Sequence, residues 1–241
     1  RSTLDRSSAA SDVYKRQVVS TAAHEGRKFS VFYTNRFNPL VVQARDTLRS
    51  GALGTLHSIE FRVLTTQVRF RGPDHWLFNR EIAGGGILSW LGCHYLDLIS
   101  YLSDDEITSV AAEIATRSND KIDVEDTATL SMRMRSGALS SLHASYVLAI
   151  SGGGFYNAAG YDQHAGVYGR EGRLWWDDHG PPKLHIESRA AEFSAAPKRT
   201  FTFTPAESRA YAGGFGERFV RTFIAAARGE CPVPCPGEAA V

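Results

Sequence analysis

His94 and Asp97 are the two side chains whose types and spacing best suit proton transfer. They lie three residues apart in a segment of helical periodicity, so both fall on one face of the predicted helix. The imidazole of histidine titrates near neutral pH, and a neighbouring carboxylate can orient it as a general acid or base. A histidine and an aspartate one turn apart are also common on surface helices, so spacing alone leaves a structural role open.

The predicted helix spans residues 87–102 and follows three glycines at 84–86. At about 100° per residue, its side chains separate into two faces. The apolar stripe consists of Leu88, Leu91, Tyr95, Leu98, Ile99 and Leu102, and the second face of Trp90, His94, Asp97 and Tyr101. The glycines permit either a tight entry turn, their more common use, or an anion site at the helix N-terminus. A metal site made by the His94–Asp97 pair with the distant His75 would lack a characteristic motif.

The rest of the chain must hold this helix against a β-sheet. Residues 57–64 and 124–134 alternate apolar and polar side chains, and a turn at 136–137 joins the second of these to a further alternating run. The other predicted strands are residues 107–114, 139–148, 166–169, 173–176 and 200–204. One-sided alternation predicts an α+β fold, an open and mostly antiparallel sheet with helices on one face. The predicted covering helices are residues 40–48, 87–102 and 215–228.

The beginning of the chain has a different character. Residues 1–17 are polar, rich in Ser and Arg and without a hydrophobic period, and they resemble translated adapter sequence, so we expect a non-native leader. Residues 18–25 have a short helical pattern and residues 28–34 indicate a strand. We therefore expect the last helix and strand of an α/β layer at 18–35, followed by one domain at 36–241.

Composition excludes several classes of protein. The 27 basic and 26 acidic residues give a net charge of +1 and form no block of one sign, so nothing suggests a nucleic-acid partner. The apolar runs are far shorter than the ~20 residues that span a bilayer, so no membrane span is predicted. Three cysteines are too few for a disulfide framework, which favours the cytoplasm. Cys231 and Cys235 flank Pro-Val-Pro and supply at most half a zinc site, so a proline-rich loop is the preferred interpretation and no metal is predicted.

Several short motifs occur in a characteristic order along the chain. They are Asn35-Arg36-Phe37-Asn38-Pro39, Ser50-Gly51-Ala52-Leu53-Gly54, Trp76 followed by Gly84-Gly85-Gly86, Gly92-Cys93-His94-Tyr95-Leu96-Asp97, Val124-Glu125-Asp126-Thr127 and Gly169-Arg170-Glu171-Gly172. Their order and spacing together resemble the Gfo/Idh/MocA family, which includes glucose–fructose oxidoreductase and inositol dehydrogenase. The resemblance covers nearly everything after Val18.

The resemblance implies a two-domain oxidoreductase, with an amino-terminal Rossmann domain that binds NAD or NADP and a second domain that supplies the substrate pocket and the oligomer interface. It implies that His94 accepts the proton of a hydroxyl on a sugar, inositol or related polyol, with Asp97 orienting the site. It also places Trp90, Trp76, His75 and Arg36 beside the substrate, and Asn35 with Arg36 beside the cofactor. The uncovered sheet face is expected to form a homo-oligomer.

Two departures from the family pattern matter for function. Trp90 stands where the family often has an aspartate, which replaces a hydrogen-bonding acid by a stacking surface. The family's Glu-Lys-Pro motif and a G-x-G-x-x-G turn after a strand do not occur in this sequence, so we expect the isolated chain not to turn over substrate. A non-catalytic sugar-binding sensor or scaffold with the same fold is the alternative.

Overall fold

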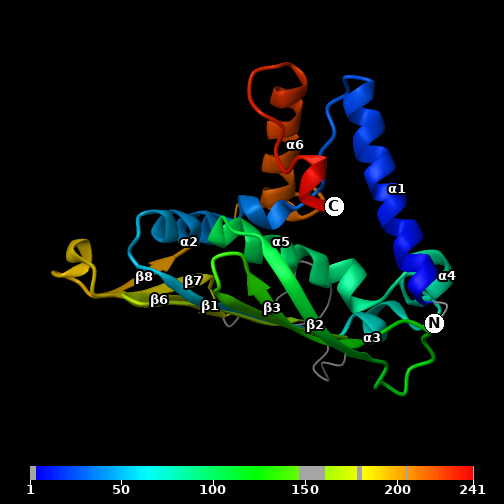
Figure 1. The fold of residues 1–241 in the computed structure, drawn as a ribbon, viewed down its shortest axis with the longest axis horizontal. Coiled ribbons are helices and arrows are strands. Elements are labelled where there is room, and N and C mark those ends of the chain that lie inside the picture. The colour runs from blue at the N-terminus through cyan, green and yellow to red at the C-terminus, as the bar shows by residue number, and fades with distance from the viewer. Residues whose placement is uncertain (1–3, 147–160, 178–180, 205, 241) are drawn as a thin grey trace. The chain divides into compact units, whose positions relative to one another are not determined.

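The computed structural model describes residues 4–146, 161–177, 181–204 and 206–240. The chain divides into two compact units, one made of Arg1–Phe37 with Ala206–Val241 and the other of Asn38–Pro205 (Figure 1). Residues 147 and 148, the end of one predicted strand, lie outside the described residues. Each unit is described by itself below.

The larger unit is built on one eight-stranded sheet with the order β2-β3-β4-β1-β5-β6-β7-β8. The strands are β1 (Leu56–Thr65), β2 (Ile107–Ala115), β3 (Thr127–Met134), β4 (Leu139–Ser145), β5 (Tyr161–Gly169), β6 (Gly172–Asp177), β7 (Lys183–Ser188) and β8 (Lys198–Thr202). Every neighbouring pair is antiparallel except β1 with β4, which run parallel. The predicted open, mostly antiparallel α+β sheet is confirmed.

The period-two patterns place the apolar side chains on one face of this sheet. Ile59, Phe61 and Val63 of β1 are buried, as are the four residues of β3 at even positions from 128 to 134. Each fully buried Leu, Ile, Val or Phe stabilises the fold by about 1.5–3 kcal/mol relative to an exposed one. His57 is the exception to the predicted alternation, because it lies at the start of β1 and is exposed.

Two helices pack on the apolar face, α2 (Pro39–Arg49) and α5 (Cys93–Ser103). The α2 helix begins where predicted because Asn38 caps it: its Oδ1 accepts from the backbone N–H of Leu40 at 3.0 Å, and Pro39 occupies the first turn. Leu40, Val41 and Ala44 form its buried face. Further short helices are α3 (Gln67–Arg71), η2 (Trp76–Phe78), α4 (Arg80–Ala83) and η5 (Ala191–Phe193).

The strand boundaries differ from the predicted ones toward the end of the sheet. Strand β7 was not predicted, although Leu184 and Ile186 are buried and alternate with polar residues. Its six-residue pattern is too short to be distinguished from a loop by periodicity alone. Strand β5 begins five residues before the predicted start, at Tyr161, because its pairing with β1 continues to Thr65.

The predicted helix 87–102 is not α-helical throughout. A π-helical turn, η3 (Leu88–Gly92), precedes α5. The surrounding stretch Arg80–Ser103 is long and apolar enough to cross a membrane by length and composition, and it contains an 18-residue window with a mean hydropathy of 1.2, half of which is buried inside the protein. One such stretch is weak evidence for a membrane span.

The smaller unit contains α1 (Leu4–His24), η1 (Thr34–Phe37), α6 (Gly213–Ala227) and η6 (Gly237–Ala240). Residues 4–17, which we predicted to belong to a leader, lie in the same helix as residues 18–24. The helix is uninterrupted because residues 1–25 contain no glycine or proline. The predicted strand at 28–34 is wrong: the segment forms only one isolated bridge, Ser30 with Pro236, and a strand requires a neighbour along its length. The predicted covering helix 215–228 forms as α6, but in this unit, where Phe219 packs edge-on against Phe32 and Phe37.

Candidate active site

The candidate site lies where three strands of the sheet end together. Parallel strands β1 and β4 finish at Thr65 and Ser145, and antiparallel β5 begins at Tyr161, which pairs with Thr65. Helix α3 follows β1 directly, so Gln67 and Arg71 are held at the same edge. The polar residues at these chain ends are brought together by the sheet register.

The glycine segment before η3 serves close packing. Gly84 adopts φ +76°, a left-handed conformation that suits glycine. A Cβ on Gly86 would lie 1.9 Å from the carbonyl oxygen of Glu125, which accepts a hydrogen bond from Ile87 at 3.0 Å. Of the two uses left open by the sequence, the structure shows the tight entry turn, with Gly86 pressed against the Glu125 backbone.

His94 is the second residue of α5 and is half-buried. Burial lowers the pKa of its imidazole below the ordinary value of 6.5. The ring is therefore neutral at pH 7 and able to accept a proton. Asp97, one turn further along α5, is 6% exposed.

The structure places Trp90 beside a cation and a second aromatic ring, and its role beside the substrate stays a prediction. It lies in η3 and is half-buried. The guanidinium carbon of Arg71 lies 5.6 Å from its ring centroid, and the ring of Tyr146 lies 6.0 Å away at a tilt of 38°. The π-helical turn thus presents Trp90 toward the ends of β1 and β4, an arrangement frequent at functional sites.

A polar network that was not predicted surrounds Trp90. Arg71 Nε donates to Gln67 Oε1 at 2.8 Å, and Gln67 Nε2 donates to the Tyr161 hydroxyl at 3.0 Å. On the neighbouring part of β5, Gln163 accepts from the Tyr95 hydroxyl at 2.6 Å. Apart from Tyr95, these residues belong to no motif, and the only sequence signal was their position at or near the ends of strands.

Tyr146 directly follows β4 and is 3% exposed. Its ring packs edge-on against Phe78 at 5.5 Å, and its hydroxyl has no hydrogen-bond partner among the residues that the structure describes. Burial, and then the charge of Glu125, raise the pKa of this phenol well above its ordinary value. The hydroxyl is therefore a protonated donor at any physiological pH.

Two predicted substrate residues, Trp76 and His75, lie in and beside the short helix η2. Trp76 is 54% exposed, and its ring lies beside His75 at 5.8 Å. His75 caps η2, because its Nδ1 accepts from the backbone N–H of Leu77 at 3.3 Å. Phe78 of the same short helix packs edge-on against the Tyr146 ring. A substrate role for Trp76 and His75 stays a prediction.

Asn35 and Arg36 lie in η1 of the smaller unit, where the Arg36 guanidinium is 5.9 Å from the Tyr33 ring centroid. Their role at a cofactor stays a prediction. In the same unit the thiol of Cys231 contacts the carbonyl oxygen of Thr222 at 3.6 Å. Within the described ranges, no group of three or more His, Cys, Asp or Glu residues is arranged to hold a metal ion.

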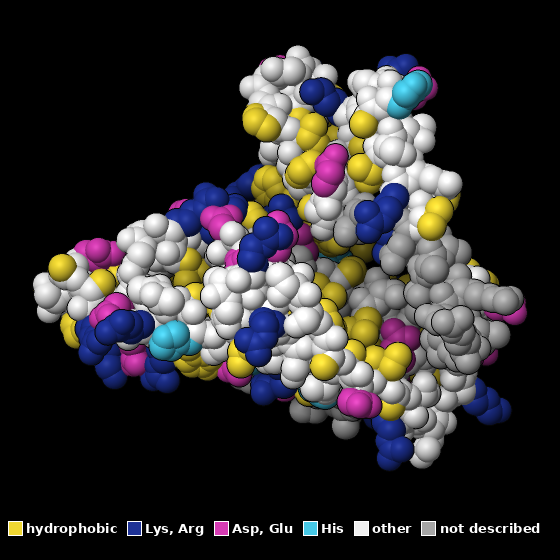
Figure 2. Space-filling view, in the orientation of Figure 1, with side chains coloured by type: hydrophobic (Ala, Val, Ile, Leu, Met, Phe, Trp, Pro, Cys, Tyr) yellow, Lys and Arg dark blue, Asp and Glu magenta, His cyan; other side chains and the backbone are white. Residues whose placement is uncertain are grey.

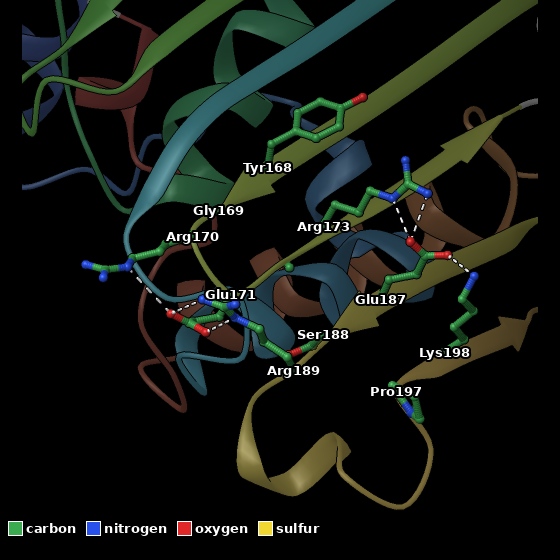
Figure 3. Close-up of a pocket in the computed structure, with 11 residues that line it drawn as sticks. Tyr168, Gly169, Arg170, Glu171, Arg173, Glu187, Ser188, Arg189, Pro197 and Lys198 are labelled. Atoms are coloured by element: carbon green, nitrogen blue, oxygen red, sulfur yellow. Dashed lines mark hydrogen bonds and ion pairs between the residues drawn. The ribbon is translucent and has the colours of Figure 1, made fainter.

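A hollow of about 490 Å³ lies at the other end of the sheet, around the β5–β6 turn (Figure 3). It is separated from Tyr161 by the length of β5, roughly 26 Å at the usual rise per residue. Its charges are paired: Glu187 contacts Arg173 at 2.8 Å and Lys198 at 3.0 Å. Hydrogen bonds from Lys198 and Arg173 lower the pKa of Glu187 below its ordinary value, so its carboxylate stays ionised. The hollow therefore offers ion pairs and no group poised for proton transfer.

Comparison with known proteins finds a family match over the part of the chain that contains Trp90, His94 and Tyr146. Residues 41–175, more than half of the chain, match the model of the GFO/IDH/MocA C-terminal domain. Similar solved structures include an oxidoreductase from Agrobacterium radiobacter in complex with NAD+, L-tartaric acid and magnesium (TM-score 0.75, 18% identity, 94% of this chain and 62% of that one). A second is levoglucosan dehydrogenase with NADH and levoglucosan (TM-score 0.73, 20% identity, 94% of this chain and 64% of that one). A third is the aldose-aldose oxidoreductase of Caulobacter crescentus with glycerol (TM-score 0.71, 21% identity, 94% of this chain and 61% of that one).

These likenesses concern the fold. The chain spans less than two thirds of the length of each of these three structures. The matched family segment contains β1, η3, α5, β3 and β4, which carry or support Trp90, His94 and Tyr146.

Proposed function

Because the chain belongs to the Gfo/Idh/MocA family, we propose that its parent protein is a nicotinamide-dependent oxidoreductase that acts on a secondary alcohol of a sugar, inositol or related polyol. The observation that supports the proposal is the half-buried His94 near the start of α5, whose lowered pKa keeps the imidazole neutral. The similar structures that contain NAD+ or NADH support the cofactor class.

The residues of this chain do not make a complete dinucleotide site. The sequence has no G-x-G-x-x-G turn after a strand, and in the described sheet only β1 and β4 are parallel. We therefore assign the nucleotide to a preceding Rossmann domain of the parent protein. Asn35 and Arg36 are the residues of this chain that we propose to contact it.

Oxidation of a secondary alcohol removes a hydride from carbon and a proton from the hydroxyl. The nicotinamide supplies the hydride acceptor when it is bound. His94 Nδ1 or Nε2 accepts the hydroxyl proton, and Asp97 orients the imidazole from the next turn of α5. Trp90 and Arg71 border the substrate. In the reverse direction the same imidazole, once protonated, returns its proton to the carbonyl oxygen.

The test is turnover by the full-length parent protein. We expect NAD(P)H to accumulate, followed by absorbance, with at least one member of a panel of sugars, inositols, polyols and sugar acids. His94→Ala should lower kcat/KM by about 10²- to 10⁴-fold. His57→Ala, an exposed histidine at the start of β1, is the matched control and should leave kcat/KM unchanged. An unchanged rate in folded His94→Ala would remove His94 from this role.

Trp90 supports one alternative, a sugar-binding sensor without turnover, because it offers a stacking surface and no acid. Binding of a sugar to the full-length protein with no turnover in the presence of either nicotinamide nucleotide would favour the sensor.

The sheet face opposite α2 and α5 is the surface that we propose joins two copies of the protein. Trp175 lies there between two neighbours: the ring of His185 is stacked on it at 5.0 Å and 17°, and the Arg173 guanidinium lies 4.6 Å from its centroid. Large, rigid aromatic side chains of this kind commonly carry interface free energy.

A further inference from the structure

Arg71 is a half-buried cation that no carboxylate neutralises within the described part of the chain. Among the described residues, its Nε donates to Gln67 Oε1 at 2.8 Å, and its guanidinium lies over the Trp90 ring. By contrast, Arg45 and Arg62, which are also partly buried, pair with Asp104 and Asp162. Because the outer amino groups of Arg71 have no carboxylate partner among the described residues, they are suited to an anion from outside the chain.

A second donor lies beside the same indole. The Tyr146 hydroxyl is buried and has no acceptor among the described residues, and a buried donor without an acceptor is normally destabilising. The charge of Arg71 acts on this phenol, which places the two groups within electrostatic reach of each other. Among the described residues, Tyr146 has no acceptor and Arg71 has no carboxylate partner, and one carboxylate could serve both.

We propose that the site binds the carboxylate of an acidic sugar or polyol, such as a uronate or an aldonate, between the Arg71 guanidinium and the Tyr146 hydroxyl, with the Trp90 ring beneath the sugar. The inference rests on the proposed function and narrows its substrate class. A carboxylate matches the planar fork of an arginine and accepts a further hydrogen bond from a hydroxyl.

The charge balance favours a monoanion. Arg71 is the one uncompensated cation identified in this described network, and the carboxylate of Glu125 is close enough to act on Tyr146. A phosphate dianion would bring one more negative charge than a carboxylate into a site where the charge of Glu125 already acts on Tyr146. A neutral hydroxyl could satisfy Tyr146 but would leave the Arg71 charge unmatched.

The test is calorimetric titration of this chain with D-glucuronate and D-gluconate, each against its neutral counterpart, D-glucose and D-glucitol, at constant ionic strength. We expect the acids to bind about 10- to 100-fold more tightly than the neutral compounds, the range of one charge-assisted hydrogen bond. Arg71→Gln should remove this preference, and Tyr146→Phe should reduce it. Arg69→Gln, an exposed arginine in the same helix, is the matched control and should retain the preference.

Trp90→Asp provides a second, independent variant, because an aspartate there would pair with Arg71 and should abolish acid binding while thermal unfolding stays cooperative. The carboxylate site would be overturned by equal affinity for acids and neutral sugars. It would also be overturned if neither acid binds, whether or not a hexose phosphate does. The oxidoreductase proposal is judged separately, by turnover of the full-length protein with any member of the substrate panel, neutral or acidic.

Discussion

At the scale of single residues, the central feature is a histidine that burial keeps neutral. The sequence identified His94 because its spacing to Asp97 and its family motif were both visible. The residues around Trp90, namely Gln67, Arg71 and Tyr146, could not be predicted. They come from separate segments, and their proximity depends on the strand register, which no local pattern encodes.

The first prediction concerns the protonation of His94. Because burial disfavours the imidazolium, its midpoint in an NMR pH titration should lie below 6.5. The unfolded chain then binds the proton more readily, so the free energy of unfolding should fall as the pH drops from about 6.5 toward the lower folded pKa. His94→Gln identifies the resonance by removing it. A midpoint at or above 6.5 would show that burial does not control this ring.

The second prediction separates stability from binding at Tyr146. Since its buried hydroxyl has no acceptor among the described residues, Tyr146→Phe should leave the free energy of unfolding unchanged or raise it by up to about 1 kcal/mol. Urea denaturation measures this difference. The same variant is expected to weaken acid binding. A loss of more than about 1 kcal/mol would mean that the hydroxyl stabilises the empty site.

At the scale of elements, the alternating strands were predictable and the entry to α5 was not. Periodicity found β1, β3 and β4 because their apolar residues share one buried face. A helical wheel assumes uniform winding, so it could not reveal the π-helical turn at Leu88–Gly92. The long-range contact with the Glu125 backbone at this entry was equally invisible in the sequence.

That contact leads to the third prediction. In Gly86→Ala the new Cβ would meet the Glu125 carbonyl oxygen at 1.9 Å, so η3 must shift. We expect the free energy of unfolding to fall by about 1–3 kcal/mol, the usual cost of overpacking, together with weakened sugar binding. Gly84→Asn is the control, because Gly84 has open space around it and asparagine tolerates its left-handed backbone. Equal stability of the Gly86→Ala variant and the wild type would contradict the packing described here.

At the scale of the molecule, the surface charges are mixed and the chain divides into two units. Basic and acidic side chains are interspersed on the face shown in Figure 2, in keeping with a net charge of +1. The sequence predicted the sheet unit well but missed that α6 packs with Phe32 and Phe37. An amphipathic pattern identifies a buried face without naming what covers it.

The fourth prediction concerns association of two copies through the sheet face opposite α2 and α5. Light scattering coupled to size exclusion should show a dimer or larger oligomer, and Trp175→Ala should weaken association by about 2 kcal/mol, the threshold for an interface hot spot. Trp76→Ala removes an exposed tryptophan that lies outside the sheet and should leave the oligomer intact. A monomer at all concentrations would contradict this interface.

The most direct test of a neutral His94 as proton acceptor is the pH dependence of kcat/KM for the full-length protein and its His94→Gln variant. We expect wild-type kcat/KM to fall on the acidic side with a pKa below 6.5, and the variant to be slower and to lack that limb. If the folded variant keeps both the wild-type rate and the acidic limb, His94 is not the base.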